Sequence, residues 1–122
     1  MKIKTADLDK LALDWAVTTI EEPDALRYGV DDWREQRCHK VKHGEFICRW
    51  HQSWAQGGPV IEREGIDVIK NGGAWTSLKT ATANHPHIRA YGPTPLIAAM
   101  RCYVASCLGD EVDVPDELFE TV

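Results

Sequence analysis

The clearest pattern of apolar and polar positions lies in the segment GPTPLIAAMRCYVASCLG, residues 92–109. Apolar residues recur there every three or four positions, which is the spacing of one face of an α-helix. Thr94 suits the N-cap, Pro95 the first helical position and Gly109 the residue after the end. The segment therefore predicts a long helix from Pro95 to the residue before Gly109. Its broad apolar face consists of Leu96, Ile97, Met100, Tyr103, Val104, Cys107 and Leu108.

A second apolar stripe predicts a helix near the N-terminus, with Leu8, Leu11, Ala12, Trp15 and Thr19 on one side and Leu13, Val17 and Ile20 widening it. Thr5 is the predicted cap of this helix. Pro23 ends it, because proline disfavours the helical conformation in the residue before it. Asp9, Lys10 and Asp14 are expected on the exposed side.

Short alternating segments predict strands between and before these helices. They are KIKT (2–5), EFICRW (45–50), the two halves of VIEREGIDVIKNGGAWTSL (60–78) and HIRAY (87–91). Asn71-Gly72 between apolar runs is a strong signal for a β-hairpin. Gly57-Gly58 is predicted to form a turn, and Pro59 sets the direction in which the chain leaves it.

This order of elements predicts an α+β fold, in which two main helices pack on one face of a small antiparallel sheet. A chain of 122 residues is expected to form a single domain over residues 1–122. Residues 24–45 have no clean period, and residues 23–50 are a possible variable insertion. Leu118 and Phe119 are expected to dock a short C-terminal turn or helix.

Composition and charge narrow the classes of function. Hydrophobic residues make up 43% of the chain, yet no long apolar run is present. The first residues lack the apolar centre of a signal peptide. A cytoplasmic protein without membrane contact is therefore expected. The net charge of −5 argues against nucleic acid as a partner. Charge is unevenly spread, because residues 110–122 carry six acidic side chains and no basic one, whereas residues 33–51 carry five basic against two acidic side chains.

Cysteine and histidine residues gather in one stretch of the chain, at Cys38, His39, His43, Cys48 and His51, with His85 and His87 further on. Zinc binds such side chains, but the usual ligand spacings are missing. The alternative is a core thiol with surface imidazoles, and no metal or other cofactor is predicted. Cys102 and Cys107 are expected to fill space in the core as free thiols.

Motifs of known enzyme classes are missing from the sequence, including phosphate-binding loops and nucleophile elbows. Glu62, Arg63 and Glu64 form the one acidic–basic triplet with possible chemistry. In a strand, Glu62 and Glu64 would face the same side and could act as an acid/base pair held by a cation. The alternative interpretation is a solvated strand face. The sequence does not decide whether the protein is an enzyme, and it favours a non-catalytic protein.

Three stretches resemble the NinX-like proteins of tailed phages and prophages. They are ALDWAV (12–17), WAQGGPVIEREGIDV (54–68) and GPTPLIAAMRCYVASCLGDEVDVPDEL (92–118). The resemblance implies a small accessory phage protein that is made in the cytoplasm of the infected bacterium. It supplies no catalytic motif.

Surface-type residues in these stretches indicate a ligand site. Gly57 and Gly58 would allow close approach of a backbone, Trp54 offers a face for stacking, and the N–H groups after Thr94 suit a phosphate or carboxylate. Five tryptophans, at positions 15, 33, 50, 54 and 75, exceed what a small core needs, although core filling remains the alternative. The predicted ligand-binding residues are Trp54, Gln56, Gly57, Gly58, Glu62, Arg63, Glu64, Trp75, Gly92, Thr94 and Arg101.

Three functions follow as hypotheses. The first is non-enzymatic binding of a small nucleotide-like ligand, with sequestration of a host defence signal as the biological role by analogy of size and context. The second is a module that binds a host or phage protein through the basic segment 33–51 and the acidic tail 110–122. The third is a small hydrolase that uses Glu62 or Glu64. A homo-oligomer is expected, since closed symmetry can turn a weak groove into a pocket between subunits.

Overall fold

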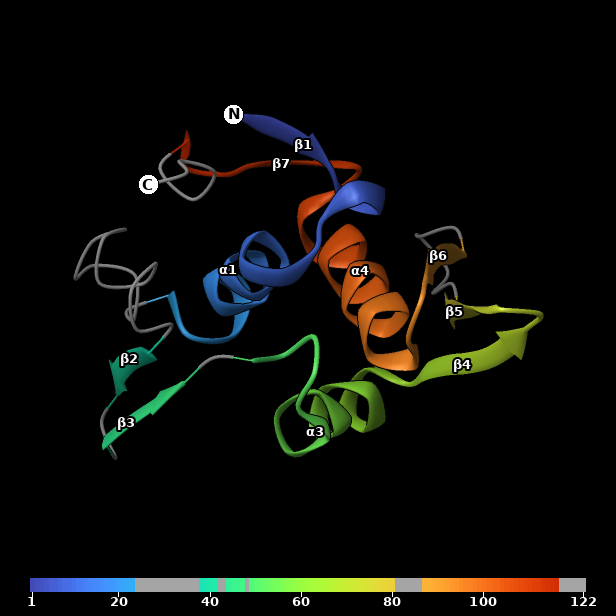
Figure 1. Cartoon of the computed structure of the whole chain (residues 1–122), viewed down its shortest axis with the longest axis horizontal. Helices are drawn as coiled ribbons and strands as arrows, with labels where there is room; N and C mark the ends of the chain where they lie inside the picture. Colours follow the sequence, from blue (N-terminus) through green and yellow to red (C-terminus); the bar gives the residue numbers. More distant parts are fainter. Residues whose placement is uncertain (24–37, 42–43, 48, 81–86, 117–122) are drawn as a thin grey trace.

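The computed structural model describes residues 1–23, 38–41, 44–47, 49–80 and 87–116. The strands in these residues are β1 (Lys2–Lys4), β2 (Cys38–Val41), β3 (Gly44–Ile47), β4 (Ile66–Asn71), β5 (Ala74–Lys79), β6 (Ile88–Gly92) and β7 (Glu111–Asp113). The helices are α1 (Lys10–Glu21), α3 (Trp54–Glu64) and α4 (Pro95–Leu108), with a 3-10 turn, η1, at Thr5–Asp7. The helices lie between the β4–β5–β6 sheet on one side and the β2–β3 hairpin on the other (Figure 1).

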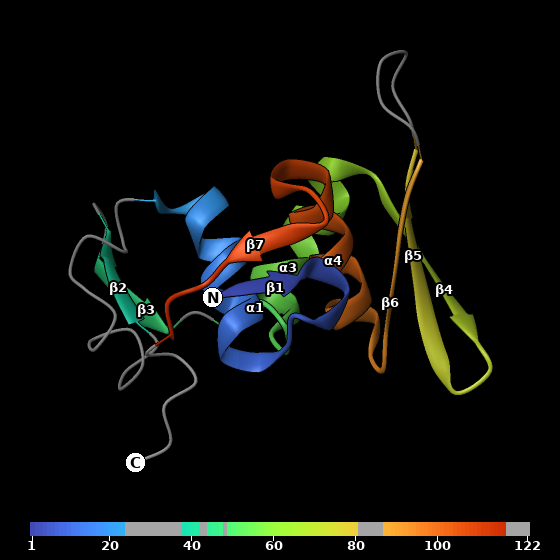
Figure 2. The same ribbon diagram turned by 90° about the horizontal axis from the view of Figure 1, so that it is seen from above.

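The largest sheet has the order β4-β5-β6 and is antiparallel throughout. Its first hairpin turns at Asn71–Ala74, where Gly72 adopts a φ of +66°, so the hairpin predicted from Asn-Gly is confirmed. Figure 2 shows α4 along one face of this sheet, with α1 on the far side of α4. The predicted α+β fold, with helices on one face of a small antiparallel sheet, is confirmed.

The core lies around α4, whose residues Ala98, Ala99, Met100 and Val104 are fully buried. Leu8, Leu13 and Val17 from the N-terminal part and Val60 from α3 pack into the same cluster. The buried hydroxyl of Ser77 on β5 donates a hydrogen bond of 2.6 Å to the carbonyl of Ala98, which fixes the sheet to the helix. Burial of this shared apolar surface supplies the main driving force for folding.

The two ends of the chain pair with each other through β1 and β7, in the register Ile3 opposite Val112. The strand predicted at residues 2–5 is therefore confirmed. The prediction that Thr5 caps the first helix is wrong: Thr5 begins η1 and its hydroxyl donates to the carbonyl of Gly109 at 2.6 Å. The cap of α1 is Asp9, whose carboxylate accepts from the Lys10 N–H at 2.9 Å.

The segment 53–64 is a helix, α3, and the predicted turn and strand are wrong there. Ser53 is its N-cap, and Gly65 ends it in the left-handed conformation with a φ of +65°. Two glycines and Pro59 make this helix intrinsically weak, so packing against α4 must stabilise it. The strand that the pattern predicts over residues 60–69 starts only at Ile66.

The predicted long helix is confirmed as α4, with Thr94 at its N-cap, Pro95 at its start and Gly109 after its end. Cys102 is buried as expected, whereas Cys107 is exposed, so its predicted place in the core is wrong. Among the tryptophans, Trp50 is buried, Trp54 is 56% exposed, and Trp15 and Trp75 are half-buried. The predictions for residues 24–37 and for Leu118 and Phe119 lie outside the described residues.

Candidate functional site

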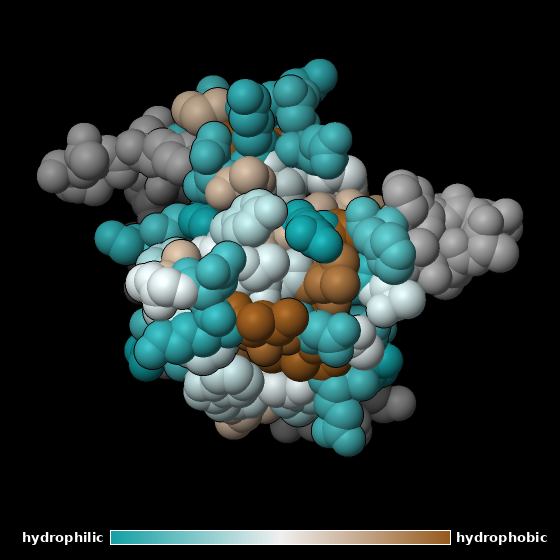
Figure 3. Space-filling view, turned by 90° about the vertical axis from the view of Figure 1, so that its right-hand side faces the viewer, coloured by the Kyte–Doolittle hydropathy of each residue, from teal (hydrophilic) through white to brown (hydrophobic). Residues whose placement is uncertain are grey.

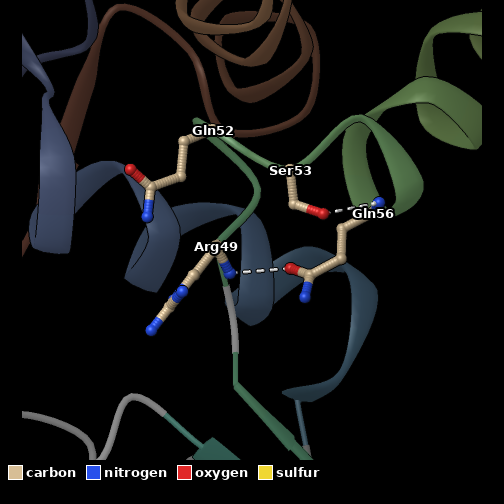
Figure 4. A pocket seen from close by; sticks show the side chains of 4 residues that line it. All are labelled: Arg49, Gln52, Ser53 and Gln56. Carbon is tan, nitrogen blue, oxygen red and sulfur yellow. Dashed lines mark hydrogen bonds between the residues drawn. The ribbon is translucent and has the colours of Figure 1, made fainter.

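The start of α3 forms one wall of an open polar hollow. Ser53 Oγ accepts a hydrogen bond from the Gln56 N–H at 3.4 Å, and Gln56 Oε1 accepts one from the Arg49 N–H at 2.6 Å (Figure 4). These three residues and Gln52 line a hollow of about 620 Å³. The side-chain carbonyl of Gln56 thus holds the loop before α3, and a ligand would have to compete with this bond.

Gly57 and Gly58 have different surroundings in α3. A Cβ atom on Gly57 would lie 2.6 Å from Leu96 Cδ2 and 3.0 Å from the carbonyl oxygen of Trp50, so Gly57 lets α3 pack closely on α4. Gly57 is buried, and Gly58 lies beside the exposed ring of Trp54. The open glycine bend that the sequence predicts is therefore wrong, because both glycines lie within α3 and Gly57 is packed against α4.

Arg63, near the end of α3, is the centre of an ion-pair network. Its guanidinium pairs with the carboxylate of Glu21 on α1, donates to the hydroxyl of Tyr103 at 3.1 Å and donates to Glu64 Oε2 at 3.0 Å. The Tyr103 hydroxyl donates to Glu21 at 2.7 Å, and Lys79 Nζ on β5 lies 3.0 Å from Glu64 Oε1. The network ties α1, α3, α4 and β5 together.

Glu64 is poorly placed for proton transfer. Hydrogen bonds from Arg63 and then from Lys79 hold the pKa of its carboxyl below the ordinary value, and each of its oxygens has a cationic partner. Glu62 is exposed, and positions two apart on a helix point in different directions. The prediction that Glu62 and Glu64 share one side of a strand is wrong, because both lie in α3.

The start of α4 is tightly packed against β6. A Cβ atom on Gly92 would lie 2.7 Å from the Ala98 nitrogen, and the hydroxyl and carbonyl oxygens of Thr94 accept from the Ile97 and Ala98 N–H groups at 3.2 and 3.1 Å. Gly92 is paired with Trp75 across the sheet. The Ile97 N–H, one of the backbone donors proposed for an anion, therefore already has an acceptor within the protein.

Arg101, on α4, is fixed by main-chain carbonyls. Its Nε donates to the carbonyl of Leu8 at 2.7 Å and its NH1 donates to the carbonyl of Tyr91 at 2.9 Å. Within the part of the chain that the structure describes, no carboxylate forms an ion pair with Arg101. Its positive charge is thus held in place without being neutralised, which is the arrangement that favours an anionic group.

A hollow of about 310 Å³ lies beside Arg101, between the chain ends and the sheet. We call it the Arg101 pocket. Arg101, Lys4 and Arg89 provide positive charges on its lining, and Asp110 and Glu111 provide negative charges. Its remaining lining residues are Thr5, Ala6, Ala90, Tyr91 and Ala105. Small side chains on the walls leave space next to the guanidinium. Tyr91, which also lines the pocket, is 58% exposed.

Comparison with known proteins identifies the family of this chain. The family model described as bacteriophage P22 NinX matches residues 4–107. The chain belongs to the NinX family. Membership makes it a phage accessory protein, and the resemblance inferred from the sequence is confirmed. No curated protein matches the chain. Among the described residues, no helix has the length and apolarity needed to cross a membrane.

A buried Asp–His pair in this NinX family member was missed by the sequence analysis. Asp14, expected to be exposed, is fully buried, and its Oδ2 lies 2.7 Å from Nδ1 of His51, which is 9% exposed. Within the described residues there is no group of three or more potential metal ligands, and the side chains of Cys38, His39, His43 and Cys48 lie outside them. The side chain of His51 is engaged by Asp14.

The predicted ligand residues fall into separate groups. Trp54, Gln56, Gly57 and Gly58 lie at the start of α3, Glu62, Arg63 and Glu64 at its end, Trp75, Gly92 and Thr94 near the start of α4, and Arg101 further along α4. Arg101 is the member that lines a pocket with two further cations, Lys4 and Arg89. Arg89 and Tyr91 were missed, although the alternation in HIRAY already puts them on one side of a strand.

Proposed function

We propose that this phage accessory protein is a non-enzymatic binding protein for a small anionic, nucleotide-like ligand, and that the ligand occupies the Arg101 pocket. The observation that carries the proposal is the guanidinium of Arg101, fixed by the carbonyls of Leu8 and Tyr91 and not neutralised by a carboxylate of the described residues. A guanidinium fixed in this way loses little conformational entropy when it pairs with a phosphate.

The chemistry of the pocket favours a nucleotide-like ligand over a bare anion. Lys4 and Arg89 would share the negative charge of a phosphate with Arg101. Asp110 and Glu111 would accept hydrogen bonds from amino or hydroxyl groups of a base or sugar, and the Tyr91 ring would offer a stacking face. A volume of about 310 Å³ is at the lower end for small-molecule sites, which suits a group the size of a mononucleotide.

The biological role we propose is sequestration of a nucleotide signal of host defence in the cytoplasm of the infected bacterium. Membership of a phage family and the small size of the chain support this role. A binding protein without catalysis suffices for sequestration, so no acid/base pair is required. The third hypothesis, a hydrolase using Glu62 or Glu64, has no supporting observation, since Glu64 is engaged in ion pairs.

Isothermal titration of the full chain tests the proposal. The probes are AMP, ADP-ribose, a cyclic dinucleotide and inorganic phosphate, each up to about 1 mM. We expect binding of at least one nucleotide and weaker binding of phosphate. Lys4→Gln and Arg89→Gln should each weaken binding about tenfold, the scale of one charge-assisted hydrogen bond. Lys2→Gln, the same change on the same strand but outside the pocket, is the matched control.

Two results would contradict this function. The first is absence of heat with every probe, and the second is equal binding by the Lys2, Lys4 and Arg89 variants. Arg101→Gln is less informative alone, because it also removes bonds to Leu8 and Tyr91 that support the fold. Recovery of the intact nucleotide after incubation would support binding without hydrolysis.

A different observation favours association with another protein, through a surface other than the segments 33–51 and 110–122 of the second hypothesis. The face of the β4–β5–β6 sheet opposite α4 is uncovered and carries the exposed side chains of Ile69 and Tyr91. Exposed apolar side chains that are grouped on one face are typical of an association surface. A substitution of Ile69 tests association through this face without changing the Arg101 pocket, because Ile69 does not line that pocket.

A further inference from the structure

The outer face of the sheet, opposite α4, has an apolar centre. Ile69 on β4 and Tyr91 on β6 are each 58% exposed, and both line a shallow groove of about 280 Å³ together with Thr76 and Leu78 of the central strand. Figure 3 shows brown, hydrophobic side chains gathered in the middle of this side of the molecule, with hydrophilic ones around them. An uncovered apolar centre with a polar rim is the form of an interface.

The strand register arranges the outer face in two rows. In one row Ile69 lies opposite Thr76, and Thr76 lies opposite Tyr91. In the next row Asp67 lies opposite Leu78, and Leu78 lies opposite Arg89. Alternation along each strand puts both rows on the same face, so one row is apolar at both ends and the other is acidic at one end and basic at the other.

The two charges in the second row have no partner among the residues that the structure describes. Asp67 and Arg89 are exposed, and among the described residues neither side chain forms an ion pair or hydrogen bond. They lie on the two edge strands, β4 and β6, with β5 between them. They are thus two strand spacings apart, at about 4.8 Å for each spacing, and Leu78 lies between them.

A two-fold axis parallel to β5 makes this face complementary to itself. Rotation about that axis puts a second sheet face to face with the first and exchanges its β4 and β6 edges. Asp67 of one copy then lies over Arg89 of the other, Ile69 lies over Tyr91, and Leu78 meets its own counterpart. An axis across the strands would instead leave the charges opposite apolar or like groups. Isologous contacts of this kind are the commonest in homodimers.

We propose that the outer face of the β4–β5–β6 sheet binds a second copy of this chain about a two-fold axis parallel to β5, with reciprocal Asp67–Arg89 ion pairs. Sheets that pack face to face keep their strands within about 30° of each other, which preserves the contacts near the axis. Arg89 and Tyr91 also line the Arg101 pocket, so the two proposals are separated at Asp67 and Ile69, which do not line it.

The small area of this face predicts a weak dimer. Three short strands bury less than the roughly 1,200 Å² of a standard interface, so we expect a dimer in rapid exchange with the monomer. Sedimentation velocity of the full chain from about 10 μM to 1 mM, in about 0.15 M salt and with a reducing agent, measures this exchange. The expected result is a sedimentation coefficient that rises with concentration from the monomer towards the dimer.

Charge reversal tests the register. Asp67→Arg and Arg89→Asp each place like charges opposite one another and should lower the association constant at least tenfold. The double variant restores opposite charges and should recover association to within about threefold of the wild type. Glu62→Arg, an exposed change of the same charge on α3, should leave association unchanged. Circular dichroism of each variant confirms folding.

Three outcomes would overturn the proposal: a wild-type monomer at every concentration, a double variant as weak as the single ones, or an equal effect of Glu62→Arg and Asp67→Arg. Ile69→Lys provides a second measurement, because it removes an apolar contact without altering either charged residue. Unchanged association in this variant would also count against the proposed face. Nucleotide titration of Asp67→Arg separates the two proposals, since its ligand affinity should equal that of the wild type.

Discussion

His51 Nδ1 lies 2.7 Å from Oδ2 and 2.8 Å from Oδ1 of Asp14, and the backbone N–H of His51 donates to Oδ1 at 3.0 Å. A buried carboxylate in the middle of α1 thus holds the loop that precedes α3. The neighbouring indole strengthens the link, because Trp50 Nε1 donates to Thr18 Oγ1 at 3.0 Å. Buried polar contacts therefore anchor to α1 the loop that lines the open polar hollow at the start of α3.

Asp14→Ala should lower the free energy of unfolding by about 3–5 kcal/mol, the usual cost of leaving one partner of a buried pair alone. Urea denaturation measures the change. Asp67→Ala is the control, because Asp67 is exposed and has no ion pair among the described residues, and it should change stability by less than about 0.5 kcal/mol. A loss below about 1 kcal/mol for Asp14→Ala would contradict this role.

Gly57→Ala and Gly58→Ala should have opposite effects on stability. Alanine favours a helix over glycine by about 1 kcal/mol. At Gly58 the nearest atom to an added Cβ is Trp54 Cε3 at 3.9 Å, so the gain is retained. At Gly57 the Cβ would clash with Leu96 and with the carbonyl of Trp50, and overpacking costs roughly 1–3 kcal/mol. Thermal unfolding of both variants checks the signs, and stabilisation by Gly57→Ala would refute the close packing.

Glu64 should contribute to the acid limb of stability. Because Arg63 and Lys79 lower its pKa in the folded protein, its contribution is fully present above the ordinary value of 4.5 and is lost as the pH falls through the lowered pKa. The difference in unfolding free energy between wild type and Glu64→Gln should be below about 1 kcal/mol at pH 7 and should shrink as the pH falls below 4.5. Glu62→Gln, the same substitution at an exposed position of α3, is the matched control.

Cys107 should react with alkylating reagents well before Cys102. Cys107 is exposed, whereas Cys102 is buried and desolvation raises the pKa of its thiol, which lowers the fraction of reactive thiolate. Brief iodoacetamide treatment at pH 8, followed by digestion and tandem mass spectrometry, locates the modified residue. Equal labelling of both cysteines in the native protein would be inconsistent with this structure. In the unfolded control, both cysteines should be labelled.

The elements that the sequence predicts correctly are those with local determinants. Thr94, Pro95 and Gly109 specify the ends of α4 by their own conformational preferences, and Asn71-Gly72 specifies the hairpin. α3 has a local N-cap in Ser53 and a terminating glycine in Gly65, but Gly57, Gly58 and Pro59 in its interior are typical of a turn. Packing against α4 stabilises this helix, and Gly57 allows the close approach to Leu96, a residue distant in sequence.

The candidate site shows the same division. Arg101 was predicted, but the helix pattern says nothing of the carbonyls of Leu8 and Tyr91 that fix it. Its place beside Lys4 and Arg89 depends on the meeting of the first strand with the sheet. These residues are far apart in the chain, so no local pattern could have brought them together.

By itself, the sequence determined the family, the fold class, the ends of α4 and the hairpin, because short-range preferences and a matching family pattern suffice for these. The tertiary structure alone decided that Gly57 closes against α4, that Asp14 is buried with His51, and that three cations surround the Arg101 pocket. The physical reason is that packing and desolvation act between elements, and their free energy depends on neighbours that the local sequence does not contain.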